Sequence, residues 1–177
     1  MTFEQSVIAS GVGGAIGAFI GFLGALMIFF LKENRQKENL RKSTIANLKL
    51  ELAYNINLYN DFENKIQKCI EALSNKSRAI YLTLDYQFIG TFFAIQFYQS
   101  GLLLKYFHSE DMKKWNIMLT QIGAGAEKHV TDCVTQWREG KDIEQEKVYS
   151  ALDFEKTQIN YAKEMSQYLL DALQQKA

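Results

Sequence analysis

The sequence predicts an all-α protein, in which an N-terminal transmembrane helix continues into a cytoplasmic domain that resembles a four-helix bundle. Three observations lead to this fold class. The 177 residues include no proline, against a usual frequency of about 5%, and no sustained alternation of Val, Ile and Thr marks a strand. Apolar residues instead recur at spacings of three and four. We expect a transmembrane helix over residues 1–32, a basic juxtamembrane helix over 33–44 and a cytoplasmic helical domain over 45–177.

The first element is an uncharged stretch of 25 residues from Val7 to Leu31, which contains six of the eleven glycines. A helix of this length spans roughly 37 Å, enough to cross a bilayer. On a helical wheel five glycines fall within an arc of about 100°, at Gly13, Gly14, Gly17, Gly21 and Gly24. Because glycine costs a helix about 1 kcal/mol relative to alanine, a glycine face predicts close packing between helices in the membrane. We therefore expect a homo-oligomer.

Charges around this stretch predict its orientation. Residues 32–49 hold six basic and two acidic side chains, a net charge of +4, whereas Glu4 is the one charged side chain before Val7. By the positive-inside rule the N-terminus lies outside and the C-terminal domain is cytoplasmic, at the inner (plasma) membrane. A cleavable signal peptide would have a basic start and a shorter apolar core, so we expect an uncleaved anchor.

The remainder of the chain limits the classes of function. From residue 50 onward, 14 basic and 17 acidic side chains give a net charge of −3, which argues against a general binder of DNA or long RNA. Cys69 and Cys133 have no disulfide or metal spacing and suit a reducing cytoplasm. His129 precedes Cys133 by four residues, but zinc needs three or four ligands, so a packed core pair is favoured. No phosphate-binding loop or catalytic motif occurs, and we expect no enzyme, no cofactor and no metal.

The helical pattern continues beyond the membrane segment. No glycine or proline interrupts residues 25–75, so we expect the membrane helix to run without a joint into the first helix of the domain. The asparagines of that helix, Asn47, Asn55, Asn57, Asn60 and Asn64, are expected to line a solvated face. A loop follows at residues 74–77, and residues 79–85 are either a short extended segment or the start of the next helix.

The second helix of the domain is predicted over residues 86–100 and ends at Gly101, a plausible C′ position. Together with residues 102–107 it makes a second apolar stretch. Three glutamines and a serine lower its hydropathy, so a buried core helix is favoured over a second membrane span.

Two further helices complete the domain. Ser109 is the expected N-cap of a helix that begins with acidic residues and stops at residue 140. Gly123 and Gly125 lie inside it, as weak points or as sites of close packing. The last helix follows a capping-box-like restart formed by Asp142 and Gln145 and runs to about residue 174.

Two groups of cations and aromatic residues lie near predicted turns and are candidates for ligand binding. Cations at helix starts hold phosphates, and aromatic rings stack on bases. The alternative, which the pattern favours, is that the aromatic residues fill the core while the lysines solvate its rim. The first group is Lys76, Arg78 and Tyr81, and the second is Lys105, Tyr106, His108, Lys113, Lys114 and Trp115.

Two stretches, NLKLELAYNINLYNDF and FYQSGLLLKYFHSEDMKKWN, resemble bacterial single-span proteins in which a Tyr-x-x-Gly-x-Leu turn precedes an acidic helix start. Tyr98 and Gly101–Leu103 match this turn. The layout of the whole chain resembles the small membrane effectors of bacterial antiviral defence that accompany type III CRISPR systems. The resemblance implies a cytoplasmic domain that binds a cyclic oligoadenylate second messenger as an oligomer and perturbs the membrane. No diagnostic binding motif is shared, so it assigns no functional residue.

Two functions remain open. The chain is either a ligand-gated membrane effector, whose glycine-faced helices shift from a closed to a leaky packing, or a passive anchor whose helical domain docks a partner protein. In the first case the ligand must bind the open state more tightly than the closed one. In the second case the glycine face serves dimerisation alone.

Overall fold

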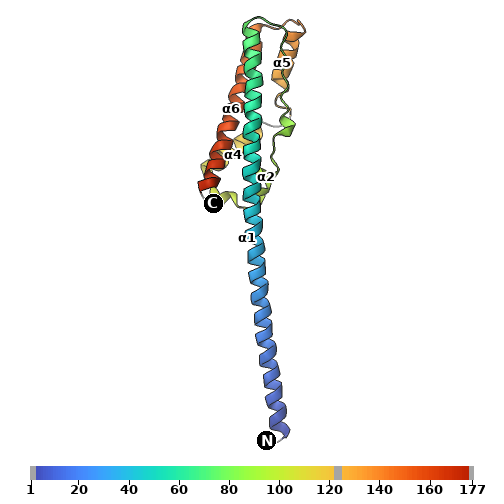
Figure 1. The fold of residues 1–177 in the computed structure, drawn as a ribbon, viewed down its shortest axis with the longest axis vertical. Helices are drawn as coiled ribbons and strands as arrows, with labels where there is room; N and C mark the ends of the chain where they lie inside the picture. The colour runs from blue at the N-terminus through green and yellow to red at the C-terminus, as the bar shows by residue number, and fades with distance from the viewer. Residues whose placement is uncertain (1–2, 122–124, 176–177) are drawn as a thin grey trace. The chain divides into compact units, whose positions relative to one another are not determined.

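The structure is a computed structural model, and it describes the backbone of residues 3–121 and 125–175 and the side chains of residues 21–116 and 125–175. Within these ranges the chain forms helices and connecting segments, without a β-strand (Figure 1). The all-α fold class is therefore confirmed. The helices are α1 (Phe3–Ser74), the short 3-10 helix η1 (Tyr86–Phe88), α2 (Phe92–Gln99), α3 (Leu103–Tyr106), α4 (Ser109–Gln121), α5 (Lys128–Arg138) and α6 (Gln145–Gln175).

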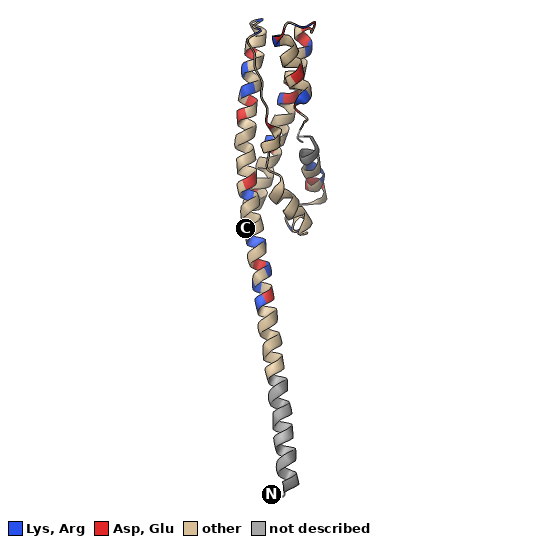
Figure 2. Ribbon diagram, turned by 90° about the vertical axis from the view of Figure 1, so that its right-hand side faces the viewer, with Lys and Arg blue, Asp and Glu red and all other residues tan. Residues whose placement is uncertain are grey.

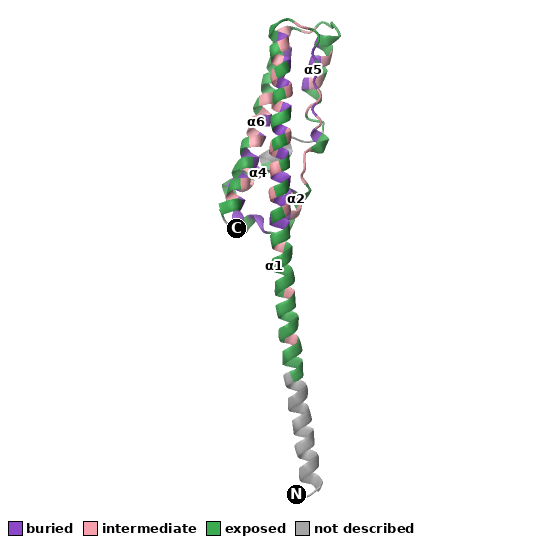
Figure 3. Cartoon of the chain, viewed as in Figure 1, coloured by how far each residue is buried: buried purple, intermediate pink, exposed green. Residues whose placement is uncertain are grey.

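The chain divides into two compact units, residues 1–43 and residues 44–177. In the first unit most of the described apolar side chains are exposed, among them Phe22, Met27 and Phe29, each with about 60% or more of its surface accessible (Figure 3). No helix in the described part of the chain is long and apolar enough to span a membrane. The first unit thus consists, as far as it is described, of an exposed stretch of α1.

The predicted glycine face falls largely outside the described side chains. Gly13, Gly14 and Gly17 are outside the residues whose surroundings the structure describes, so it says nothing of their packing. Gly21 and Gly24 are described, and a Cβ atom added at either position would meet no atom within 4 Å. The face therefore stays a prediction.

Oppositely charged neighbours pair along the basic segment of the first unit (Figure 2). Lys37 Nζ lies 2.7 Å from a carboxylate oxygen of Glu33, and Arg41 Nη1 lies 3.4 Å from one of Glu38. Both pairs are spaced by one helical turn, which supports the helix by a few tenths of a kcal/mol each.

The core of the second unit is built on the long helices α1 and α6. Residues 44–74 of α1 and the whole of α6 each carry a buried apolar stripe at helical spacing. Short helices α4 and α5 both pack against α6. The stripe of α1 is Leu48, Leu52, Tyr59, Phe62, Ile66 and Leu73, and that of α6 is Val148, Leu152, Ile159, Ala162, Leu169 and Leu173. These stripes confirm the amphipathic spacing of three and four that the sequence shows.

The predicted single helix over residues 109–139 is wrong, because two helices occupy this range. α4 ends at Gln121 and α5 begins at Lys128. Gly125, in the turn before α5, has a φ of +93°. A right-handed helix cannot pass through that backbone conformation, and glycine adopts it without a steric penalty. Gly125, one of the two glycines expected as weak points or sites of close packing, thus lies where the predicted helix is interrupted.

The start of α4 differs from the prediction by one residue. α4 begins at Ser109, which makes His108 rather than Ser109 the N-cap. The carboxylate of Asp111 accepts the backbone N–H of His108 at 2.9 Å. A side chain in the third helical position that reaches back to the N-cap N–H forms half of a capping box. The predicted acidic first turn is confirmed, with Glu110 and Asp111, but Asp111 rather than Ser109 supplies the capping hydrogen bond.

The predicted capping box before the last helix is also wrong. An N-cap at Asp142 would start the helix at residue 143, but α6 begins two residues later, at Gln145. The side chain of Gln145 donates instead to the backbone carbonyl of Leu73 at 2.8 Å. Leu73 lies in the last turn of α1, where carbonyl groups have no partner within the helix. Gln145 therefore joins the start of α6 to the end of α1.

The segment between α1 and α2 is mostly irregular. Ile80, Leu82 and Leu84 are buried while Tyr81 is exposed, an alternation typical of extended chain. The predicted helix over residues 86–100 is shorter than expected, since η1 and α2 are separated at Gly90. Gly101 has a φ of +70° directly after α2 and its C-cap Ser100, which confirms it as the C′ residue.

Candidate functional site

Polar side chains of α1 hold the start of α2. The carboxylate of Glu51 accepts the backbone N–H groups of Phe93 and Ala94 at 2.8 and 2.9 Å. These are free donors of the first helical turn, and a carboxylate there also interacts favourably with the helix dipole. The side-chain amide of Asn55 binds both backbone groups of Gly90. Although it was expected on a solvated face, Asn55 is buried. We call Glu51 and Asn55 the α1 clamp.

Four aromatic rings hold α2, α3 and α4 together. Phe97 of α2 lies 5.8 Å from Tyr106, 6.1 Å from Phe107 and 6.4 Å from Trp115, measured between ring centroids. Phe107 and Trp115 are 5.9 Å apart. All four side chains are buried, and tilted or edge-on pairs at these separations are favourable. The rings of Tyr106 and Trp115, two predicted ligand residues, thus belong to the core.

A pocket of about 500 Å³ opens beside this cluster. Its walls come from α2, α3 and α4, and they combine apolar side chains with an exposed tyrosine, two amides and one cation. Its volume lies within the usual range for small-molecule sites, which are mostly apolar with a few polar groups. The lining residues are Ile95, Tyr98, Gln99, Leu103, Met112, Lys113, Trp115 and Asn116. We call it the α2–α4 pocket.

The chemistry of the α2–α4 pocket suits a ligand with an aromatic ring and a negative charge. Tyr98 exposes 57% of its surface and offers a ring face for stacking. Lys113 is exposed and supplies the positive charge. The indole N–H of Trp115 is buried and has no hydrogen-bond acceptor among the described residues. Trp115 thus contributes part of its ring to the wall of the pocket, while its N–H is buried.

The structure divides the second predicted group of ligand residues. Lys113 and Trp115 line the α2–α4 pocket. Tyr106 and His108 line a smaller pocket of about 340 Å³ that also includes Asp111, Tyr168, Asp171, Ala172 and Gln175. Lys114 places its ammonium 5.0 Å from the ring centroid of Tyr168, and Lys105 is exposed and lines neither of these pockets.

Six lining residues of the α2–α4 pocket were missed, although one sequence signal pointed to two of them. The Tyr-x-x-Gly-x-Leu turn begins at Tyr98 and ends at Leu103, and both residues line the pocket. Gly101 between them takes the left-handed conformation that turns the chain from α2 into α3. The turn therefore places its first and last residues on the same pocket.

The first predicted group lies at the opposite end of the second unit. Gln145 bonds to the end of α1 and Tyr168 bonds to Asp111 at 2.7 Å. These two residues are 23 positions apart on α6, or about 35 Å along a helix. The first loop and the α2–α4 pocket therefore cannot form one site within a single chain.

The residues of that first group are engaged in the structure of the loop. Arg78 donates to the backbone carbonyl of Trp137 at 3.1 Å, and its guanidinium lies 4.9 Å from the Trp137 ring centroid. The guanidinium of Arg138 lies 5.6 Å from the ring centroid of Tyr81. Lys76 has a φ of +54° at the end of α1. These contacts favour the structural explanation for Arg78.

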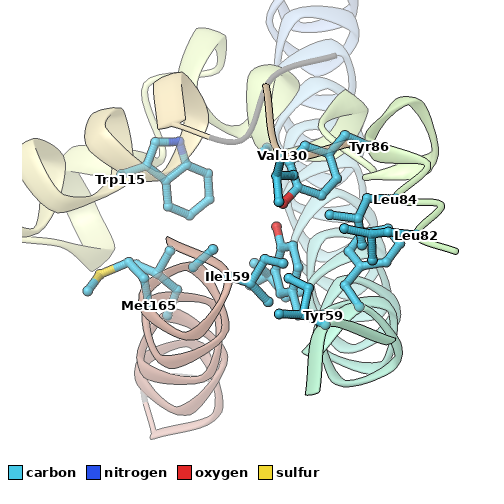
Figure 4. Packing of buried hydrophobic residues seen from close by; sticks show 14 of the residues in the cluster. Tyr59, Leu82, Leu84, Tyr86, Trp115, Val130, Ile159 and Met165 are labelled. Carbon is cyan, nitrogen blue, oxygen red and sulfur yellow. The ribbon is translucent and has the colours of Figure 1, made fainter. Parts of the chain in front are cut away.

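A second polar cluster lies inside the core. The hydroxyl of Tyr86 donates to the carboxylate of Glu155, and both side chains are buried. Burial raises the pKa of the Glu155 carboxyl above its usual value of 4.5, and the nearby charge of Glu127 raises it further. Figure 4 shows the hydroxyls of Tyr59 and Tyr86 pointing toward each other. Burial raises the pKa of Tyr59 to about 12.

The described residues contain no group of three or more His, Cys, Asp and Glu side chains placed to bind a metal ion. Comparison of the chain with family models, with curated proteins and with solved structures finds no match. The α2–α4 pocket is therefore the site on which a functional argument rests.

Proposed function

We propose that the chain is a membrane-anchored, oligomeric bacterial effector without catalytic activity of its own. In this proposal the glycine-rich segment crosses the inner membrane once with the N-terminus outside, and the cytoplasmic domain senses a ligand. The observation that carries the proposal is the α2–α4 pocket, which combines a stacking surface and a cation with mostly apolar walls. Antiviral defence is the setting that the sequence resemblance implies.

The ligand class follows from the walls of the pocket. An exposed tyrosine ring stacks on a base, amides such as that of Gln99 bind base edges, and Lys113 pairs with a phosphate. A volume of about 500 Å³ accommodates a drug-sized ligand, which corresponds to one nucleotide. A cyclic oligoadenylate contains several nucleotides, so it would bridge the pockets of more than one copy. An oligomer is then part of the sensor.

A route from the pocket to the membrane segment supports the proposal. α2 provides Ile95, Tyr98 and Gln99 to the pocket, and its first turn is held by the α1 clamp. α1 is helical from Phe3 to Ser74. A ligand that shifts α2 would therefore pull on Glu51 of α1. The membrane segment opens only if the ligand binds the open state more tightly than the closed state.

Calorimetric titration of the full chain in detergent with cyclic oligoadenylates of several ring sizes tests the ligand. We expect binding, and we expect Lys113→Glu to weaken it about 10-fold or more, the effect of losing one charge-assisted contact to a phosphate. Lys105→Glu is the matched control, because Lys105 is an exposed lysine that does not line the pocket. Absence of binding across the set favours the alternative, a passive anchor that docks a partner protein.

A second experiment tests the membrane step. The double variant Gly17→Leu with Gly21→Leu should abolish ligand-dependent leakage of dye from vesicles, because leucine side chains prevent close packing of the helices. Ligand binding measured by calorimetry should stay unchanged. Unaltered leakage in this variant would contradict gating through the glycine face.

A further inference from the structure

α2 is apolar on both of its sides, and only one side is covered. Ala94 and Phe97 face the core and are buried. On the other side Phe92, Ile95 and Tyr98 expose 71%, 46% and 57% of their surfaces. A helix that is hydrophobic all round is normally covered all round. The exposed side of α2 therefore lacks a covering partner among the described residues.

The segments that flank α2 in the chain add two more exposed apolar side chains. Phe88 in η1 exposes 57% of its surface and Leu104 in α3 exposes 72%. With about 200 Å² for each full side chain, the five residues Phe88, Phe92, Ile95, Tyr98 and Leu104 expose roughly 600 Å². This is at the upper end of the largest apolar patches on ordinary monomers, and it approaches the ~800 Å² that each partner contributes to a standard interface. We call these five residues the α2 face.

The charge pattern of the α2 face indicates the kind of partner. From Tyr86 to Ser109 the sequence contains no acidic residue, and Lys105 is its one lysine or arginine. The five side chains of the α2 face carry no charge, and the centres of protein interfaces are likewise depleted of charge. An equally apolar surface is the complementary one, and a second copy of this chain carries it.

We propose that the α2 face is an interface between copies of this chain. We expect the copies to lie parallel, and this part of the proposal rests on the proposed function. Anchors in one membrane hold neighbouring domains at the same height and at a high effective concentration. Ile95 and Tyr98 belong to both the α2 face and the α2–α4 pocket. A ligand in the pocket therefore lies next to the neighbouring copy. A contact of this face with the same face on another copy is two-fold, so it joins copies in pairs.

Chemical cross-linking of the full chain in membranes tests the interface. Phe92→Cys should give a covalent dimer with a short bifunctional maleimide, while the native Cys69 and Cys133 are buried and react slowly. Phe154→Cys on α6 is the matched control, because Phe154 exposes 61% of its surface outside the α2 face. Dimer yields from Phe92→Cys that are no higher than those from Phe154→Cys would overturn the proposal.

A lipid surface is the other candidate to cover the α2 face. Tryptophan fluorescence in vesicles of brominated lipid tests for it. Phe92→Trp should show no quenching beyond that of the parent chain, and strong quenching would overturn the proposal, because bromine quenches on contact. Phe29→Trp reports separately on anchoring, since Phe29 lies in the proposed membrane segment. If Phe29→Trp is not quenched, the proposed function fails at the membrane step. The cross-linking result then still decides whether the α2 face joins two copies.

Discussion

The side-chain amide of Asn55 makes two hydrogen bonds to the backbone of Gly90. Its Nδ2 donates to the Gly90 carbonyl at 2.7 Å, and its Oδ1 accepts the Gly90 N–H at 2.8 Å. This pairing satisfies both backbone groups in the bend that separates η1 from α2. One turn earlier on α1, Glu51 binds the first N–H groups of α2. The start of α2 is thus fixed by two side chains of α1.

We predict that Asn55→Ala lowers the free energy of unfolding by about 2–3 kcal/mol, because it leaves two backbone groups of Gly90 without partners. Thermal or urea unfolding of the full chain, followed by circular dichroism, measures the change. Asn57→Ala is the control on the same helix, since Asn57 is exposed. It should change the free energy by less than about 0.5 kcal/mol. Equal effects of the two substitutions would show that the clamp does not stabilise the fold.

A second prediction concerns the close approach of Gly90 to Glu51. A Cβ atom added at Gly90 would lie 2.9 Å from Cγ of Glu51 and 3.4 Å from Oδ1 of Asn55. Gly90→Ala should therefore displace the α1 clamp and destabilise the protein by about 1–3 kcal/mol. The neighbouring Thr91→Ala serves as the control, because Thr91 is the N-cap of α2 but its side chain makes no capping hydrogen bond. If Gly90→Ala unfolds at the wild-type temperature, the clamp tolerates this displacement.

The α1 clamp also shows what the sequence could not predict. The buried stripes of α1 and α6 follow from the periodic spacing of apolar residues, which depends on local sequence alone. Asn55 fits a solvated position equally well, and its partner Gly90 is 35 residues away. Pairing between distant segments leaves no local pattern. For the same reason the side chain of Gln145 gave no sign that it binds Leu73, 72 residues earlier.

The candidate site was predictable to a similar degree. The sequence placed cations and aromatic residues near the start of α4, and Lys113 and Trp115 do line the α2–α4 pocket. It could not separate Lys113 from Lys105, because that depends on how α3 turns between α2 and α4. The Tyr-x-x-Gly-x-Leu pattern predicted a turn from Tyr98 to Leu103, but it did not predict that both residues line the pocket.

A third prediction follows from the end of α1. Lys76 has a φ of +54°. Its N–H donates to the carbonyl of Leu73 at 2.9 Å, and the N–H of Ser77 donates to the carbonyl of Ala72 at 3.0 Å. This pattern is the Schellman motif, in which the residue with positive φ is usually glycine. Lys76→Gly should raise the free energy of unfolding by about 1 kcal/mol, because lysine is strained in this conformation.

Denaturant unfolding of the Lys76→Gly variant measures this gain. Lys68→Gly, at an exposed position inside α1, is the control and should lower the free energy of unfolding by about 1 kcal/mol. A loss of stability in both variants would indicate that the side chain of Lys76 contributes more than its backbone strain costs.

The last prediction concerns pH and the buried carboxyl of Glu155. Burial raises its pKa above 4.5, so the folded state binds the proton more tightly than the unfolded state does. Stability is therefore highest when Glu155 is protonated, and it falls as the pH rises from about 4.5 through the raised pKa. Glu155→Gln carries no charge, and its amide oxygen still accepts the hydroxyl of Tyr86.

Glu155→Gln should thus unfold at a higher temperature than the wild-type chain at pH 7, and at the same temperature near pH 4. Unfolding followed by circular dichroism across this pH range measures the difference. Glu164→Gln is the matched control, because Glu164 is an exposed carboxylate of the same helix, and it should leave the pH profile unchanged. A Glu155→Gln variant that is less stable at pH 7 would mean that the ionised carboxylate is favoured in the core. The hydrogen bond from Tyr86 and the charge of His129, which both lower the Glu155 pKa, would then together outweigh the cost of burial.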